Sequence, residues 1–228
     1  MAWKLPFFLL LITCAPAVGF LPPTSRCNYS HSIFSRKKSY DLAPLELFRS
    51  DTNTAEETAT LKDTIRQLAR GTSNGIDASK SVRDEIATLS KQLVKMNPTK
   101  SPALSEKLDG SWALVYTTNP GSSAGKLGPF TGDVEQAIRI TGENPEYVNY
   151  VRLGGGLVEG MLSASWDVLS KKEWLVKFET LQFRILGIKI LEKDLKAEGT
   201  WKMEYLDDDF RILYAEGGNS ENIYILSK

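Results

Sequence analysis

The chain has 228 residues but only two cysteines and one histidine, and all three lie near its start, at Cys14, Cys27 and His31. If that segment is removed on maturation, the remaining protein has no thiol and no imidazole. Disulfide frameworks, zinc sites with Cys or His ligands, Cys nucleophiles and Ser-His-Asp triads are then excluded. Catalysis would have to rely on Asp, Glu, Lys, Tyr or Ser alone. We expect a protein that is not an enzyme and that holds no metal and no cofactor.

A net charge is also lacking, because 28 basic residues balance 28 acidic ones. No strong field therefore attracts nucleic acid, and we expect no nucleic-acid partner. The charge is nevertheless unevenly distributed. Residues 1–40 hold five basic residues and no acidic one, which leaves 23 basic and 28 acidic residues in 41–228. This asymmetry separates a cationic leader from a mildly acidic body.

The leader has the pattern of a targeting segment. An apolar run at Leu5–Thr13 is too short to span a bilayer as a helix. Ala17-Val18-Gly19 then supplies the small residues of a cleavage site, so we interpret residues 1–19 as a secretory signal peptide. The alternative is a buried N-terminal strand.

The next stretch, Phe20–Tyr40, is rich in Ser, Thr and basic residues and contains no acid, which is the composition of an organelle transit peptide. A signal peptide followed at once by Phe20 and such a tract resembles the bipartite plastid presequence of algae with secondary plastids. This resemblance implies that residues 20–50 comprise a plastid transit peptide and a linker.

Two helices are predicted within residues 54–96. Apolar residues recur at helical spacing in Thr54–Arg70 and again in Ser81–Met96. Gly71 ends the first run, and Asn97-Pro98 ends the second. Their polar faces carry charges of both signs, whereas a helix lying on a membrane would be more basic. We therefore expect the helices to dock on a core rather than to anchor the protein in a membrane.

From Gly110 onward the apolar residues alternate with polar ones, which is the pattern of half-buried strands. Gly-rich and Asp/Asn-rich turns separate the segments. No helix-length segment intervenes, which argues against a parallel sheet and a dinucleotide-binding fold. Eight or nine short strands in residues 110–228 predict an antiparallel barrel or sandwich. The expected strands lie near 112–117, 134–141, 147–153, 161–168, 174–179, 183–191, 201–205, 210–215 and 222–226.

Three connections between the predicted strands contain residues that could bind an ion or a ligand. Gly154-Gly155-Gly156 lies between strands, so a turn is favoured over a phosphate-binding loop, which needs a helix behind it. Asp207-Asp208-Asp209 offers either a hairpin turn with capped backbone or a calcium or magnesium site, and the turn is favoured because the spacing fits no EF-hand. The long connection Asn119–Gly132 is either a lid over a barrel mouth or a plain loop.

The tripeptide Gly110-Ser111-Trp112 resembles the Gly-x-Trp that opens the first strand of lipocalins. In that family the Trp closes the barrel floor, and an Arg near the last strand stacks on it. Arg211 is placed to do so here. The alternative is that Trp112 is an ordinary core residue.

The block Tyr205-Leu-Asp207-Asp-Asp-Phe-Arg211-Ile212, followed by Glu216-Gly217-Gly218-Asn219 and an apolar strand, resembles the C-terminal signature of the plastid lipid-associated proteins, or fibrillins (PAP family). The order of the helices and of the Leu108–Thr118 segment fits the same family, so the resemblance covers 61–228. It implies a fibrillin domain at 54–228, with helices at 54–96 and a barrel at 110–228. The implied fold class is mainly β, a lipocalin-like antiparallel β-barrel with two N-terminal helices packed on it. Its signature residues are Gly110, Trp112, Tyr205, Asp207 and Arg211.

The resemblance also implies a function. It implies a plastid (chloroplast) protein, associated with plastoglobules or thylakoids, that binds or organises prenyl lipids, carotenoids or fatty acids. The alternative is a structural or adaptor protein with a filled interior, which contacts a plastid lipid surface or a lipid-biosynthesis enzyme. A third reading, an enzyme, would need a buried acid/base pair. For an interior ligand, strand alternation selects Tyr116, Ile138, Trp174 and Phe178 as lining residues.

The segment Leu181–Leu191 is apolar on both faces. Gly187 would allow a bulge that shifts the alternation. Either the two helices cover this segment, or it is a surface that meets lipid or a partner through Phe183, Leu186 and Ile188. The two readings differ in whether these side chains are exposed.

Overall fold

The computed structural model describes residues 49–142, 145–217 and 220–228. The predicted signal peptide at 1–19 and the predicted transit peptide up to residue 48 lie outside these residues. Helix α1 covers Arg49–Ala69 and helix α2 covers Lys80–Lys95, which confirms the two predicted helices. Helix α1 begins at Arg49 rather than Thr54. Helix α2 begins after Ser79, whose side chain accepts a hydrogen bond from the Val82 N–H.

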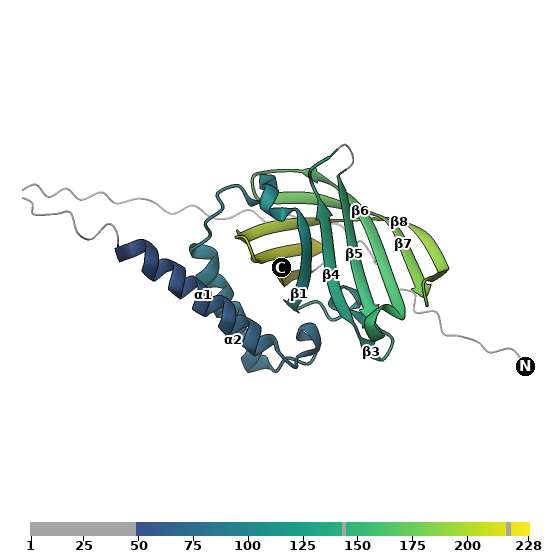
Figure 1. Cartoon of the computed structure of the whole chain (residues 1–228), viewed down its shortest axis with the longest axis horizontal. Helices are drawn as coiled ribbons and strands as arrows, with labels where there is room; N and C mark the ends of the chain where they lie inside the picture. Colours follow the sequence, from purple (N-terminus) through teal and green to yellow (C-terminus); the bar gives the residue numbers. More distant parts are fainter. Residues whose placement is uncertain (1–48, 143–144, 218–219) are drawn as a thin grey trace, which may run out of the picture.

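Eight antiparallel strands close into a barrel, in the order β1-β10-β9-β8-β7-β6-β5-β4 (Figure 1). Each strand pairs with its sequence neighbour, and β1 closes the ring between β4 and β10. Two short strands, β2 and β3, form a separate hairpin inside the Asn119–Gly132 connection. The predicted antiparallel barrel with two N-terminal helices is thereby confirmed. The strands are β1 Gly110–Thr117, β2 Lys126–Leu127, β3 Phe130–Thr131, β4 Asp133–Arg139, β5 Glu146–Leu153, β6 Val158–Val168, β7 Glu173–Ile185, β8 Ile188–Leu206, β9 Phe210–Gly217 and β10 Ser220–Ser227.

The expected strand at 183–191 is wrong, because the chain reverses in its middle. Strand β7 runs to Ile185 and β8 begins at Ile188, with a two-residue turn at Leu186-Gly187 where a bulge was expected. These two strands are much longer than their neighbours. In the part of the chain that the structure describes, β8 pairs with β9 only from Thr200, so Ile188–Gly199 pairs with β7 alone.

One end of the barrel, which we call the floor, is closed by two short 3₁₀ turns, η2 at Pro102–Leu104 and η3 at Glu106–Leu108. Two tryptophan side chains hold these turns. The Trp174 Nε1–H donates to the Ala103 carbonyl oxygen at 2.8 Å, and the Trp112 Nε1–H donates to the Leu108 carbonyl oxygen at 2.9 Å. The opposite end, which we call the loop end, carries the Asn119–Gly132 connection and the β7–β8 turn.

Two hydrophobic cores share the barrel wall. The interior core fills the barrel, and the outer core lies between the wall and the two helices. In β10, Tyr224 and Leu226 point into the interior core, whereas Ile223 and Ile225 point into the outer one. The helices lie along the flank that carries β1, and the β7–β8 hairpin projects from the opposite side (Figure 1).

Candidate functional site

The structure places three of the four predicted lining residues against the interior core. Ile138 and Trp174 are buried in it, and Phe178 packs on it while staying partly exposed. Tyr116 lies instead in the outer core, under the helices. The reason is an irregularity in the pairing of β1 with β10 between Leu114 and Tyr116, which shifts the alternation of β1.

The connection Asn119–Gly132 covers part of the loop end. Leu127 packs against the interior core, whereas Phe130 is 64% exposed. Asn74, in the turn between the helices, fastens this connection, because its amide donates to the carbonyl oxygens of Ala124 at 2.9 Å and Gly132 at 3.0 Å. The connection is therefore held in place over the barrel mouth.

The predicted contact between Trp112 and Arg211 is present. Both side chains are fully buried, and the Arg211 guanidinium carbon lies 4.9 Å from the centre of the Trp112 ring. The Lys228 ammonium lies 4.6 Å from the same ring. The Trp112 ring thus makes two cation–π contacts, with Arg211 inside the barrel and with Lys228 at the C-terminus.

The Arg211 guanidinium has few partners for a buried cation. Its Nη2–H donates to the Gln136 side-chain oxygen at 2.5 Å, whereas Nε and Nη1 have no hydrogen-bond partner among the described residues. Burial lowers the pKa of Arg211 to about 10, which still leaves it charged at neutral pH. The interior therefore contains a charged group that the surrounding side chains only partly satisfy.

The acidic turn Asp207–Asp209 is explained by local structure. Asp207 Oδ1 accepts hydrogen bonds from the backbone N–H groups of Asp209 and Phe210, at 3.0 and 2.7 Å. Its Oδ2 accepts from the Tyr205 hydroxyl at 2.6 Å. No group of three metal-ligating side chains occurs in the described ranges. The turn caps its own backbone, as the favoured interpretation predicted.

The same turn holds helix α1 on the barrel. Lys62 forms ion pairs with Asp207 at 2.9 Å and with Asp209, and Arg66 pairs with Asp209 at 2.7 Å. Burial alone would raise the pKa of Asp209, but the bonds from Lys62 and Arg66 lower it below its usual value. The spacing of the signature did not reveal this role, because the cations come from a helix over 140 residues away in the chain.

Replacing Asp209 by Asn should lower the free energy of unfolding by about 0.5–1 kcal/mol at pH 7, since Asp209 is half exposed and solvent screens its pairs. Asp208→Asn is the control, because that side chain is 87% exposed and should matter less. A lowered pKa stabilises the fold above the unfolded pKa of about 4 and loses that effect as pH falls through the folded value. Urea titrations should therefore show the difference between wild type and Asp209→Asn shrinking from pH 7 to pH 2. A difference that grows in acid would contradict this assignment.

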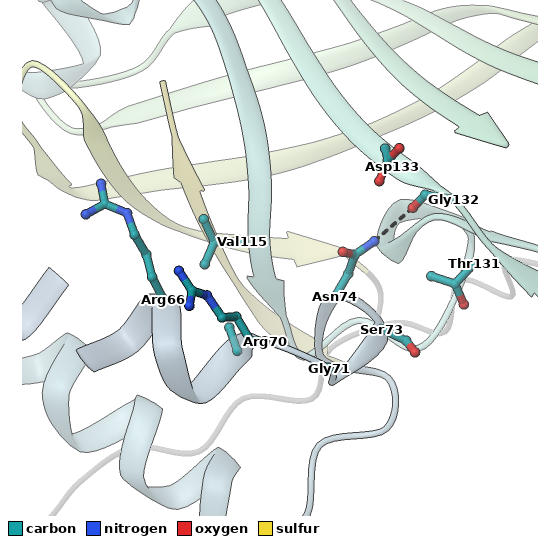
Figure 2. A pocket seen from close by; sticks show the side chains of 10 residues that line it. Arg66, Arg70, Gly71, Ser73, Asn74, Val115, Thr131, Gly132 and Asp133 are labelled. Carbon is teal, nitrogen blue, oxygen red and sulfur yellow. Dashed lines mark hydrogen bonds between the residues drawn. The ribbon is translucent and has the colours of Figure 1, made fainter. Parts of the chain in front are cut away.

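A pocket of about 510 Å³ opens outside the barrel, where α1 ends beside β1 and β3 (Figure 2). Arg66 and Arg70 lie along one wall, and Thr131 and Asp133 lie along the other. A second pocket, of about 400 Å³, lies between the first half of α1 and the acidic turn. Both pockets carry charges of both signs and open to solvent. The first is lined mainly by polar groups, whereas Ala55, Ala59, Met96 and Pro98 give the second a more apolar lining.

The described part of β7 and β8 excludes one of the two interpretations of Leu181–Leu191, because the helices do not cover this segment. The helices cover β1, β9 and β10, and they leave the tip of the β7–β8 hairpin uncovered. Leu186 is 70% exposed and Ile188 is 66% exposed, while Phe183 is partly buried. Neighbouring apolar side chains are exposed as well. We call this surface the apolar tip, and it consists of Leu157, Ile185, Leu186, Ile188, Ile190 and Leu191.

The turn at the apolar tip has an unusual residue. Leu186 and Gly187 have φ angles of +52° and +77°, the signs that a type I′ hairpin turn requires. Asn, Asp and Gly are the usual residues there, because a larger side chain is strained at positive φ. The Leu186 N–H donates to the Leu157 carbonyl oxygen at 2.8 Å, which fixes the turn beside the β5–β6 connection. Sequence reasoning missed this turn because Leu-Gly is not a usual hairpin signal.

None of the helices in the described ranges is long and apolar enough to cross a membrane.

Comparison with known proteins agrees with this architecture. The PAP_fibrillin family model matches residues 59–227, which include the second half of α1, all of α2 and the barrel. Among curated proteins, Plastid lipid-associated protein 1, chloroplastic, of Brassica campestris is 35% identical over 133 residues, covering 55% of this chain and 40% of that protein. Probable plastid-lipid-associated protein 5, chloroplastic, of Arabidopsis thaliana is 26% identical over 164 residues, covering 72% and 68%.

A third relative, the Light-induced protein, chloroplastic, of Solanum tuberosum, is 33% identical over 126 residues, covering 52% of this chain and 38% of that protein. The match thus spans less than half the length of the Brassica and Solanum proteins. The family model, in contrast, matches most of the chain, from the middle of α1 to the end of β10. The chain therefore belongs to the PAP/fibrillin family.

Proposed function

We propose that this protein attaches to a plastid lipid surface, a plastoglobule or a thylakoid, through its apolar tip. There it binds or organises hydrophobic small molecules such as prenyl lipids, carotenoids or fatty acids. The role is not enzymatic. Its site of action is the chloroplast, because the relatives in Brassica campestris and Arabidopsis thaliana are named as chloroplastic plastid lipid-associated proteins.

The observation that carries this proposal is Leu186. It combines a strained backbone angle, at φ +52°, with a side chain that is 70% exposed. A strained residue usually persists because the surrounding packing requires it, or because function does. Packing does not require Leu186, since most of its side chain contacts solvent. A leucine at this position is explained if its side chain inserts into an apolar phase.

The composition of the apolar tip supports a lipid phase over an ionic partner. Ile188 and Ile190, 66% and 58% exposed, add aliphatic surface next to Leu186. The charges beside them are of both signs, and Lys189 is paired with Glu192 at 2.6 Å. Aliphatic residues without a basic cluster fit insertion between acyl chains better than attraction to an anionic surface.

The alternative role, an adaptor for a lipid-biosynthesis enzyme, is favoured by a different observation. The main chain of Ile188–Gly199 pairs with β7 on one side only, within the described residues. Such an edge can accept a strand from a partner protein. An adaptor would use that edge, whereas lipid attachment uses the apolar tip, so variants of the two can be tested separately.

Replacing Leu186 by Asn should separate binding from folding. Asn tolerates positive φ, so the variant should be as stable as the wild type or more stable by about 0.5–1 kcal/mol. Association with neutral-lipid droplets coated with a phospholipid monolayer should nevertheless fall, because an inserted leucine is lost. The measurement is flotation of the purified protein with the droplets, at low and at high salt.

The double variant Leu186→Asp/Ile188→Asp should reduce flotation further. The control is Leu104→Asp, because Leu104 is 60% exposed at the floor, on the opposite end of the barrel. Full flotation of a folded Leu186→Asp/Ile188→Asp variant would contradict attachment through the apolar tip. An equal loss of flotation for Leu104→Asp would show that any exposed leucine supports droplet binding, and that the apolar tip has no special role.

A further inference from the structure

The pocket at the end of α1 has two charged walls that do not pair with each other (Figure 2). Arg70 follows the last residue of α1 and is exposed, and its guanidinium bonds to no described residue. Asp133 lies on the opposite wall, and its carboxylate is likewise without a partner in the described ranges. Arg66, beside Arg70, is already paired with Asp63 and Asp209. Arg70 and Asp133 are therefore the charges that the pocket leaves available to a ligand.

The back of the pocket is a split in the barrel wall. Strands β1 and β4 pair as far as Ala113 and Glu135, and the described ladder between them stops there. Val115 and Asp133 would be the next partners in register, but both line the pocket instead. The pocket thus arises from the way two neighbouring strands diverge. Its volume of about 510 Å³ lies in the range of small-molecule sites.

Asn74 supplies an acceptor whose direction is fixed. Its amide nitrogen donates to the carbonyl oxygens of Ala124 and Gly132, so the amide cannot turn over without losing both bonds. The Asn74 side-chain oxygen is thereby held on the side of the arginine wall (Figure 2), and no described residue donates to it. Ser73 and Asn74 both have positive φ angles, +51° and +60°. Such strain persists where packing or function requires it, and here it positions Asn74.

These free groups specify the chemistry of a ligand. The planar fork of Arg70 matches the oxygens of a phosphate. The Asn74 oxygen and the Asp133 carboxylate can only accept hydrogen bonds, so they need donors such as hydroxyl groups. The Thr131 hydroxyl, on the same wall as Asp133, can donate or accept. A phosphate at one end and neighbouring hydroxyls at the other would satisfy all four groups.

We propose that this pocket binds a phosphate ester of glycerol or of a similar polyol. Arg70 holds the phosphate, and Asn74 and Asp133 accept hydrogen bonds from the hydroxyls. Two sources share this chemistry, a lipid head group and a soluble ester. The pocket includes Thr131 and Gly132 of the connection at the loop end, the same end as the apolar tip. The lipid source therefore rests on the proposed attachment to a lipid surface, whereas the site itself does not.

The first test needs no lipid surface. The purified protein is titrated with glycerophosphate, inorganic phosphate, glycerol and phosphoethanolamine, and binding is followed by calorimetry at constant low ionic strength. Glycerophosphate should bind about tenfold or more tightly than inorganic phosphate or glycerol, because only glycerophosphate reaches both walls. Equal affinities of glycerophosphate and inorganic phosphate would overturn the proposal. Tighter binding of phosphoethanolamine would overturn the polyol assignment, since the acceptors would then hold an ammonium group.

Variants of the two walls should have different effects. Arg70→Gln should weaken glycerophosphate binding about tenfold. Asp133→Ala should abolish the preference over inorganic phosphate while phosphate binding persists. The control is Arg139→Gln, which removes an equally exposed charge at the far end of β4. All three side chains are exposed, so the variants should fold, and circular dichroism checks this. Equal losses for Arg70→Gln and Arg139→Gln would overturn the site, because binding would then depend on overall charge.

Vesicles distinguish the two sources. Phosphatidylcholine vesicles with either phosphatidylglycerol or phosphatidylserine carry the same net charge, but only the first present a glycerol with free hydroxyls. A preference for phosphatidylglycerol that Arg70→Gln abolishes would identify the lipid head group, whereas no preference, with glycerophosphate binding intact, would identify the soluble ester. The Leu186→Asp/Ile188→Asp variant should bind soluble glycerophosphate like the wild type. Failure of this site and failure of attachment through the apolar tip therefore give different results.

Discussion

Replacing Trp112 by alanine is expected to destabilise the protein by about 3–5 kcal/mol, the range for a fully buried Trp. Three losses add up at this position. The interior core loses one of its two floor tryptophans, the Leu108 carbonyl oxygen loses its donor, and the cation of Arg211 loses the ring that covers it. The free energy of unfolding is measured by urea titration followed by circular dichroism.

Trp166→Ala is the matched control for this experiment. Trp166 stacks on Trp174 with ring centres 4.7 Å apart, but it is only partly buried, and its indole holds no 3₁₀ turn. We expect its loss to cost about 1–2 kcal/mol. If Trp112→Ala costs no more than Trp166→Ala, the floor does not depend on the Gly-x-Trp signature.

Replacing Gly75 by alanine is expected to have the second large effect. Gly75 has φ +103°, and a Cβ there would lie 2.2 Å from the Thr117 carbonyl oxygen, a backbone atom that cannot move alone. Backbone strain of about 1–3 kcal/mol then adds to steric overlap of about 1–3 kcal/mol. The variant should unfold at clearly lower urea concentration than the wild type.

Gly71→Ala separates the two contributions. Gly71 lies in the same connection between the helices and has φ +73°, but a Cβ there would meet nothing within 4 Å. It should therefore show the strain alone, about 1 kcal/mol. Equal effects at Gly71 and Gly75 would mean that the close approach between the turn and β1 does not limit stability.

Much of the fold follows from local pattern. The two helical stripes, the period-two segments and the turn residues predict α1, α2 and all eight barrel strands, with one segment divided wrongly. The contact of Trp112 with Arg211 followed from a family signature and not from spacing, because the two residues lie at opposite ends of the barrel sequence. Patterns within single elements were therefore enough to predict the architecture, whereas the long-range contact could be predicted only from the family signature.

Two features could not be predicted because they depend on pairing between strands. Tyr116 lies outside the interior because the pairing of β1 with β10 shifts beside it. Such a shift in register cannot be predicted from the sequence of β1 alone. The docking face of the helices was also undetermined. Their apolar stripes fit either Leu181–Leu191 or the outer face of β1, β9 and β10, and only the closed barrel shows that the latter is in reach.

The division of residues between two cores has a consequence for cooperativity. Strands β9 and β10 give alternate side chains to the barrel interior and to the layer under the helices, as Leu213 and Ile212 do on β9 and Tyr224 and Ile225 do on β10. Neither core can open without displacing a strand that the other one needs. The helical pair is thus no independent module on a finished barrel, and we expect helices and barrel to melt in a single transition.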